Sequence, residues 1–146
     1  METFRDYKVF LYYFKIIGRL NLIKGQNHPE AAIELGVLAE IYSKQGDYTK
    51  ALSLHMQVLD VLEKQIGQEH PLTAAALNDA ALAYSNLAMY EKAIPLFIRA
   101  LEIGNKTLGE NHPDVWMIIN NISVCYYNLG KYDDALYLQN KILTLS

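Results

Sequence analysis

Histidine followed by proline is the most regular pattern in this sequence that could carry chemistry. His28, His70 and His112 each precede a proline and follow one another at intervals of 42 residues. Imidazole is a common zinc ligand, but its bond to zinc is only about 2 Å long. Equivalent residues on packed helices lie about 8–10 Å apart, so these histidines cannot share one ion. We therefore predict no metal site, and we expect each His-Pro pair to mark the start of a helix.

Acidic and nucleophilic side chains show no arrangement typical of an enzyme. Asp133 and Asp134 follow Lys131 and open an apolar stretch, which suits the solvated first turn of a helix. Cys125 stands beside Tyr126 in another apolar stretch, which predicts a buried thiol. The sequence contains no Gly-rich phosphate loop, no HExxH pair and no nucleophile elbow. We therefore predict a protein with no catalytic activity and no cofactor.

Composition excludes further classes of function. Of the 146 residues 51% are hydrophobic and 20% are charged, and the formal net charge is −3. Binding of nucleic acid requires Lys and Arg clustered on one face, and no such cluster is visible. The single cysteine provides no disulfide framework, which favours a reducing compartment. We expect a cytoplasmic protein that does not bind nucleic acid.

The 42-residue interval applies to whole blocks of sequence. Within each block apolar and small residues recur at the spacing i, i+3, i+4, i+7 of one helix face, then after a break they recur again. The matching positions are Leu35/Leu77/Ile119, Leu38/Ala80/Ile122, Ala39/Ala81/Ser123, Tyr42/Tyr84/Tyr126, Gly46/Ala88/Gly130, Tyr48/Tyr90/Tyr132 and Ala51/Ala93/Ala135. Each block is therefore predicted to be two helices joined by a turn. Gly46 and Gly130 suit the left-handed conformation that ends many helices, which Ala88 would adopt at a cost of about 1 kcal/mol.

The block resembles the tetratricopeptide repeat. The family pattern is a large residue, then Leu and a small residue, then Tyr, followed by Ala-x3-aromatic. It is matched by Leu77, Ala80-Ala81, Tyr84, Ala93 and Phe97, with Ala80 at the Leu position. The ordinary repeat has about 34 residues. This longer form, with Leu108-Gly109-Glu110-Asn111-His112-Pro113 between units, is similar to the kinesin light chain and nephrocystin type. The resemblance implies an all-α fold, a right-handed α-solenoid of antiparallel helix hairpins.

We predict a single domain over residues 1–146, made of three repeats and an N-terminal helix. Residues 1–26 are a partial repeat or a capping helix, and the repeats occupy 27–68, 69–110 and 111–146. The expected helices are 29–45, 48–66, 71–87, 90–107, 113–129 and 132–145, with Pro95 inside the fourth. Attachment of the aromatic-rich helix in 1–26 to a membrane, or to a second copy, is a less favoured alternative.

The resemblance also implies where a ligand would lie. In tetratricopeptide-like stacks the first helix of each hairpin lines the concave inner face. The residues of these helices that point away from the Leu/Ala/Tyr stripe are predicted to bind a peptide or a partner helix, namely Asn78, Leu82, Asn86, Met117, Asn120, Val124, Tyr127 and Asn128. Asn amides both donate and accept hydrogen bonds, so they suit a peptide backbone. The alternative is a face that is merely exposed to solvent.

Two known ligand types of such repeats do not fit this face. A clamp for chaperone tails uses Lys, Arg and Asn to grip a terminal carboxylate. The matching positions here hold no cation and include two carboxylates; they are Gly36, Glu40, Asp79, Asn120 and Val124. Kinesin light chains grip acidic cargo peptides with a basic groove, whereas Lys44 is the only basic residue among the candidates.

A structural role is the second hypothesis. Apolar residues near the end of the sequence would have no following repeat to cover them, namely Tyr137, Leu138, Ile142, Leu143 and Leu145. A solenoid needs terminal units with a polar outer face. We therefore expect either a longer array of repeats, or self-association or docking through this end face.

Overall fold

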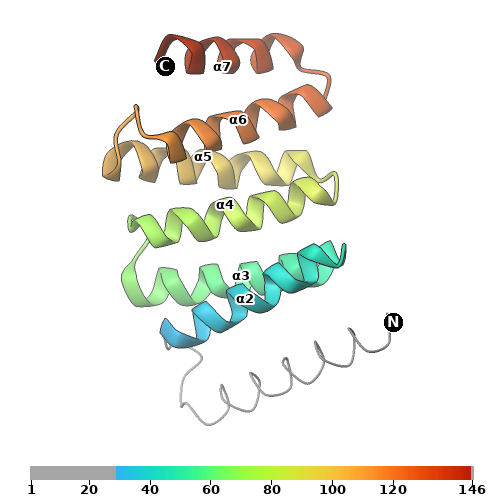
Figure 1. The fold of residues 1–146 in the computed structure, drawn as a ribbon, viewed down its shortest axis with the longest axis vertical. Helices are drawn as coiled ribbons and strands as arrows, with labels where there is room; N and C mark the ends of the chain where they lie inside the picture. Colours follow the sequence, from blue (N-terminus) through green and yellow to red (C-terminus); the bar gives the residue numbers. More distant parts are fainter. Residues whose placement is uncertain (1–28, 146) are drawn as a thin grey trace. The chain divides into compact units, whose positions relative to one another are not determined.

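The computed structural model describes residues 29–145, and this part of the chain consists of helices connected by short turns (Figure 1). The helices are α2 (Pro29–Lys44), α3 (Tyr48–Ile66), α4 (Pro71–Asn86), α5 (Tyr90–Thr107), α6 (Pro113–Asn128) and α7 (Tyr132–Leu145). Within residues 29–145 there is no strand. The predicted helix bounds are confirmed to within one residue. The predicted helix in 1–26, its membrane alternative and His28 lie outside the described residues.

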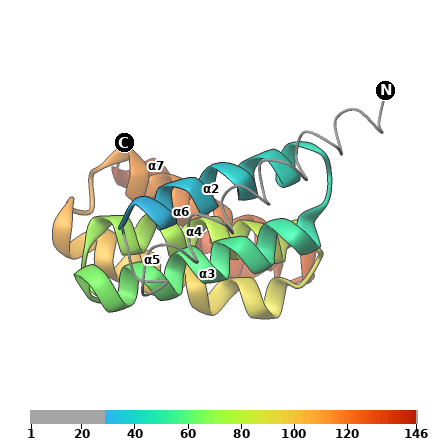
Figure 2. The ribbon, with the colours of Figure 1, turned by 90° about the horizontal axis from the view of Figure 1, so that it is seen from below.

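The chain divides into two compact units, residues 1–67 and 68–146. The described part of the first unit is the α2–α3 hairpin, and the second unit contains the α4–α5 and α6–α7 hairpins. Within the second unit, α4 and α6 are neighbours on the same side of α5 (Figure 2). The first helices of two successive hairpins therefore share one face. The single domain expected over residues 1–146 stays a prediction.

Small residues lie where the two helices of a hairpin meet. Ala81 on α4 and Ala93 on α5 are both completely buried. In the last hairpin Ser123 takes the place of Ala81, and its hydroxyl donates a hydrogen bond of 3.0 Å to the backbone carbonyl of Ala135 on α7. The distance between two packed helix axes depends on the size of the side chains at the contact. These small residues therefore permit the two helices of a hairpin to approach closely.

The turn inside each hairpin contains one residue in the left-handed conformation. The φ angles are +81° at Gly46, +59° at Ala88 and +77° at Gly130. A side chain disfavours this conformation by about 1–2 kcal/mol, a cost that glycine avoids. Ala88 thus keeps the turn of the other hairpins although its Cβ makes that turn unfavourable, as predicted from its position in the repeat.

Histidine caps the first helix of both hairpins in the second unit. The Nδ1 atom of His70 accepts a hydrogen bond of 3.0 Å from the backbone N–H of Leu72. The Nδ1 atom of His112 accepts one of 3.1 Å from the backbone N–H of Asp114. These bonds satisfy backbone donors that have no partner inside the helix. The helix-start role predicted for His70 and His112 is confirmed.

Residues of different chemical type occupy one equivalent position in the second helices of the three hairpins. The repeat interval places His55 on α3, Phe97 on α5 and Gln139 on α7 at equivalent positions. Phe97 is the largest completely buried side chain among the described residues, whereas His55 is 6% exposed. Burial lowers the pKa of the His55 imidazole below its ordinary value, and the carboxylate of Glu40 only partly opposes this. Burial of His55 therefore favours the neutral form of its imidazole.

Candidate functional site

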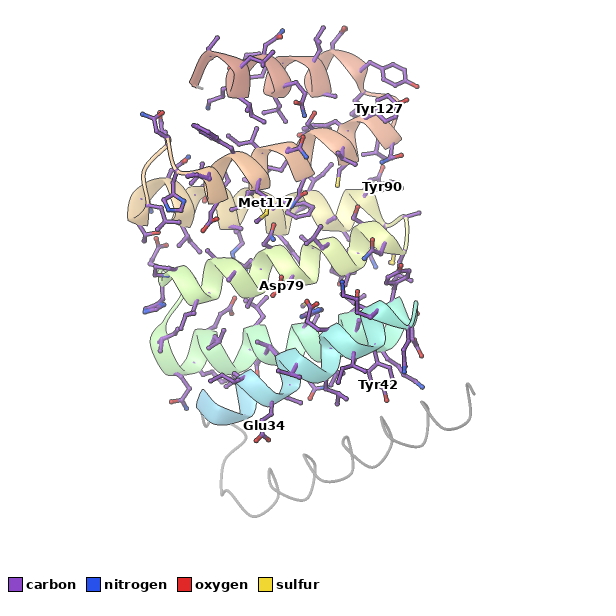
Figure 3. All side chains as sticks on the ribbon, viewed as in Figure 1. Glu34, Tyr42, Asp79, Tyr90, Met117 and Tyr127 are labelled. Atoms are coloured by element: carbon purple, nitrogen blue, oxygen red, sulfur yellow. The ribbon has the colours of Figure 1, made fainter. Side chains whose placement is uncertain are left out.

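Exposed apolar side chains lie on α4 and α6, the helices that share one face of the second unit. Leu82 on α4 is 36% exposed, and on α6 the exposure is 50% for Met117, 44% for Val124 and 63% for Tyr127. Met117 lies in the first half of α6 and Tyr127 near its end (Figure 3). Single exposed apolar residues are normal, but several along two adjacent helices provide area for a partner.

Hydrogen-bonding side chains join α4 to α6 beneath this face. The Nδ2 atom of Asn121 donates to the Oδ1 atom of Asn78 over 3.2 Å, and Asn78 is only 7% exposed. Further along, the Sγ atom of Cys125 lies 3.9 Å from the Oγ atom of Ser85. Burial raises the pKa of the Cys125 thiol, and the contact with Ser85 opposes this only in part. We call these two contacts the α4–α6 seam.

A pocket of about 230 Å³ opens at one end of the seam. Its lining comes from α4, from the end of α5 and from the start of α6, namely Pro71, Ala74, Ala75, Asn78, Asp79, Gly104, Thr107, Leu108, Asp114, Met117 and Ile118. We call it the α4–α6 pocket. Most of its walls are apolar, and its charged groups are the carboxylates of Asp79 and Asp114. Figure 3 shows Asp79 on α4 and Met117 on α6.

The close approach of α5 and α6 shapes this pocket. A Cβ atom placed on Gly104 of α5 would lie 3.3 Å from the Cγ2 atom of Val115 and 3.8 Å from the Cδ1 atom of Ile118. Val115 is completely buried. Glycine at this position thus lets the start of α6 lie directly on α5, next to the pocket.

A second, shallower hollow lies between α6 and α7. It has a volume of about 440 Å³ and is lined by Ser123, Val124, Tyr127, Tyr132, Ala135, Leu136 and Gln139. The rings of Tyr127 and Tyr132 meet edge to face with their centroids 5.5 Å apart. Leu136 is 60% exposed. This hollow joins the face of α6 to the surface of α7.

The predicted binding residues do not all lie in one site. Asn78 and Met117 line the α4–α6 pocket, whereas Val124 and Tyr127 line the α6–α7 hollow. Leu82 and Asn86 are exposed on α4 and line neither of these two spaces.

The expected role of the asparagines in holding a peptide backbone is limited by bonds within the chain. Asn120 accepts a hydrogen bond of 2.8 Å from Gln139, and Asn128 donates one of 2.9 Å to the carbonyl of Val124. Sequence reasoning also missed Asn121, Gly104, Leu108 and Asp114 as parts of the site. The signal for Gly104 was available, because the repeat interval pairs this glycine inside a helix with Leu62.

Neither a metal cluster nor a membrane span occurs within residues 29–145. In this part of the chain no group of three or more His, Cys, Asp or Glu side chains is placed to hold a metal ion. No helix described here is long and apolar enough to cross a bilayer.

Comparison with known proteins agrees with this hairpin architecture. The family model of the tetratricopeptide repeat matches residues 29–94 and 81–146. The chain belongs to the tetratricopeptide repeat family. The predicted family and the all-α repeat fold are thereby confirmed, and repeats of this family generally mediate interactions between proteins. No curated protein sequence matches the chain.

Several solved structures have the same fold. A putative kinesin light chain from Podosopora anserina, with nearly identical TPR-like repeats, gives a TM-score of 0.81 at 23% identity over 97% of this chain. BtubC from P. vanneervenii gives 0.82 at 23% identity over 99% of this chain. The TPR domain of Arabidopsis FLU gives 0.68 at 15% identity over 77% of this chain and 92% of its own. This chain spans 66% of the Podosopora protein and 56% of BtubC.

Proposed function

We propose that this protein is an interaction scaffold whose α4–α6 face binds an extended peptide or a helix of a partner protein. The observation that carries the proposal is the row of exposed apolar side chains on these two adjacent helices, of which Met117 and Tyr127 are at least half exposed. Burial of such side chains stabilises a complex by about 25 cal/mol per Å² of apolar area, before the costs of association.

The seam supports a fixed binding surface. The Asn78–Asn121 hydrogen bond and the contact between Cys125 and Ser85 join the two helices that carry the exposed row. A surface that is already ordered loses less conformational entropy when a ligand binds. The face is therefore suited to hold a partner segment without first being rearranged.

A displayed library of random 12-residue peptides, selected on the full chain, tests the proposal. Enriched peptides are synthesised with a fluorescent label and titrated by fluorescence polarisation. The double variant Met117→Glu/Val124→Glu is expected to bind them at least about tenfold more weakly, because central apolar contacts usually dominate such interfaces.

Ile98→Glu is the matched control. Ile98 lies on α5, lines neither the pocket nor the hollow and is 39% exposed. This variant should change peptide affinity by less than about twofold, since surface substitutions away from a site have small effects. The proposal fails if no peptide is enriched over the empty matrix, or if the double variant binds as the wild type does while its circular dichroism is unchanged.

Self-association through α7 is a second candidate function, favoured by one further observation. Leu136, Tyr137 and Leu143 are 60%, 69% and 71% exposed on this single helix. Large apolar groups gathered on one helix are typical of an interface. In this interpretation the α7 surface packs on another copy or on the next unit of a larger assembly.

Sedimentation velocity at increasing protein concentration distinguishes the two functions. Leu143→Glu should lower the average mass of a self-associating protein and leave binding of the selected peptides unchanged. Asn140→Glu, also on an exposed position of α7, introduces the same charge as a control. A mass that stays monomeric at all concentrations contradicts self-association.

A role as a non-catalytic protein of the cytoplasm accompanies this proposal. The family's repeat fold is typically a scaffold, and the site found here is an apolar face and not a set of catalytic groups. The one cysteine, Cys125, is free and buried, which suits a reducing compartment.

A further inference from the structure

We propose that the α6–α7 hollow is a docking site for one amphipathic helix of a partner protein, which lies there as α6 lies on α4 and α5. The inference rests on the second function proposed above, assembly through α7, and it names the occupant by its side chains. The equivalent surface of the preceding hairpin, which α6 covers, shows what such an occupant contacts.

The hollow repeats a surface that is covered elsewhere in the same unit. Its lining residues are equivalent, at the interval of 42 residues, to Ala81, Leu82, Ser85, Tyr90, Ala93, Ile94 and Phe97 of α4 and α5. The helix α6 packs on both of these helices. The Sγ atom of Cys125 on α6 lies 3.9 Å from the Oγ atom of Ser85. A helix therefore already occupies the position that corresponds to the hollow.

Exposure differs between the two surfaces as this coverage requires. On α5 the side chain of Ile94 is partly buried and that of Phe97 completely buried. On α7 the side chain of Leu136, which is equivalent to Ile94, is 60% exposed, and that of Tyr132 is 62% exposed. Leu136 and Tyr132 thus keep the apolar chemistry of a covered surface. Apolar residues exposed one turn apart on a helix favour contact with a second helix.

The buried side chains of α6 indicate the pattern that the occupant carries. Val115 and Ile118 lie next to Gly104 of α5, Ile122 follows Ile118 after one turn, and Cys125 contacts Ser85. All four of these α6 side chains are buried. The occupant should therefore have branched apolar residues at i, i+3 and i+7 and a small residue at i+10.

Two differences from the covered surface specify the occupant further. Tyr127 stands at the position of Ser85, so the residue opposite it should be smaller than cysteine, such as Ala. Asn120 is equivalent to Asn78, and its Oδ1 atom accepts a hydrogen bond of 2.8 Å from Gln139. An amide at i+6 of the occupant, the position of Asn121 on α6, would replace Gln139 as the donor. An Asn or Gln is therefore expected at i+6.

A second copy of this chain is not the source of the helix. In α6 the matching side chains are already buried in the copy's own core, with Val115 and Cys125 completely so. In α2 the equivalent residues Ala31 and Leu38 are 3% and 0% exposed. A copy could offer these faces only by opening its own structure. The partner is therefore a different protein whose helix has this pattern uncovered.

A peptide with the sequence of α6 is the probe. It contains residues 112–129 with Cys125→Ala, a hydrocarbon staple between the exposed positions 120 and 124, and a fluorescent label. Fluorescence polarisation measures its binding to the full chain. It should bind at least about tenfold more tightly than the same peptide with Ile118→Glu/Ile122→Glu, because buried apolar contacts dominate such interfaces.

Two neighbouring residues of α7 assign the binding to the hollow. Leu136 lines the hollow, whereas Tyr137 does not and is 69% exposed. Leu136→Glu should weaken binding of the α6 peptide at least about tenfold. Tyr137→Glu introduces the same charge on the same helix and should change the affinity less than about twofold. Circular dichroism verifies that both variants keep their helices.

A gain-of-function variant tests the equivalence of the two surfaces. Tyr127→Ser/Gln139→Phe introduces the residues that the covered surface has at Ser85 and Phe97. The variant should bind the α6 peptide at least about threefold more tightly, because it adds apolar area and makes room opposite position 125. The peptide with Ile118→Glu/Ile122→Glu should gain no affinity.

The outcomes separate this inference from the function on which it rests. Equal binding of the two peptides, or equal effects of Leu136→Glu and Tyr137→Glu, overturns the helix-docking site. Self-association of the chain in sedimentation velocity without binding of the α6 peptide overturns the partner helix and leaves assembly through α7 intact. A chain that stays monomeric and binds neither peptide contradicts both.

Discussion

Asn121 donates a hydrogen bond of 3.2 Å to Asn78, and this bond connects helices of two different hairpins. Asn78 is buried and Asn121 partly exposed. Removal of one partner from such a pair leaves a buried polar group without its bond, whereas removal of both can be nearly neutral. The contribution of this hydrogen bond between α4 and α6 to the free energy of unfolding can therefore be measured by mutation.

We predict that Asn121→Ala lowers the free energy of unfolding by about 1–2 kcal/mol, because the Asn78 carbonyl loses its donor. Asn78→Ala should cost a similar amount. The double variant should cost less than the sum of the two, with a coupling energy of about 0.5–1.5 kcal/mol. Urea unfolding followed by circular dichroism measures all three. Strictly additive effects would show that the bond contributes nothing.

Ala88→Gly is predicted to stabilise the protein. Ala88 adopts φ +59° in the turn between α4 and α5, where the other hairpins have glycine. Relief of this strain should raise the free energy of unfolding by about 1 kcal/mol. Gly130→Ala, at φ +77°, is the reciprocal variant and should lower it by a similar amount. Thermal unfolding of both provides the comparison, and a lower melting temperature for Ala88→Gly would contradict the strain.

Stability is predicted to decrease at mildly acidic pH because of His55. Burial lowers the pKa of this imidazole in the folded state from 6.5, so between the folded and unfolded pKa values the unfolded chain binds more protons. The stability provided by the neutral form is complete above about pH 6.5 and is lost as the pH falls toward the folded pKa.

Phe replaces His55 in the test, since Phe97 occupies the equivalent position of α5. Urea unfolding between pH 7.5 and 5 should show a smaller loss of stability for His55→Phe than for the wild type. Identical pH profiles would assign the loss to other groups.

Cys125 is predicted to react slowly with thiol reagents in the folded protein. It is completely buried at the seam, and burial raises its pKa, so both access and the thiolate fraction are reduced. Labelling with 5,5′-dithiobis(2-nitrobenzoate) at pH 8 should be at least about a hundredfold faster in 6 M guanidinium chloride than in buffer, since labelling of a buried thiol requires opening. Equal rates would place the thiol at the surface.

Much of the fold could be predicted because its determinants are local and repeat. Helix lengths follow from apolar periodicity, and the left-handed turns follow from Gly46 and Gly130. The capping role of His70 was readable from the recurring His-Pro pair. Each of these features depends on a few residues that are close in sequence. An assignment made in one repeat therefore applies to the equivalent positions of the others.

The site was less predictable because it depends on how helices pack across hairpins. Equivalent positions were expected to have equivalent surroundings, yet Asn78 is buried against α6 while Asn120 contacts Gln139 of its own hairpin. Each helix packs on its hairpin partner, α5 or α7, but α4 also contacts α6 of the next hairpin, and residues 29–145 include no hairpin that α6 could contact in the same way. The repeat pattern does not tell how α6 is oriented relative to α4, and this orientation is what brings Asn121 within hydrogen-bond distance of Asn78.

The bond between Asn121 and Asn78 also has a mechanical consequence. A peptide that contacts both α4 and α6 would span two hairpins, so separation of the last hairpin from its neighbour would require release of the peptide. Occupancy of the face should therefore slow amide exchange in α6 and α7 well beyond the contacted residues. Ligand binding and resistance to local unfolding would increase together.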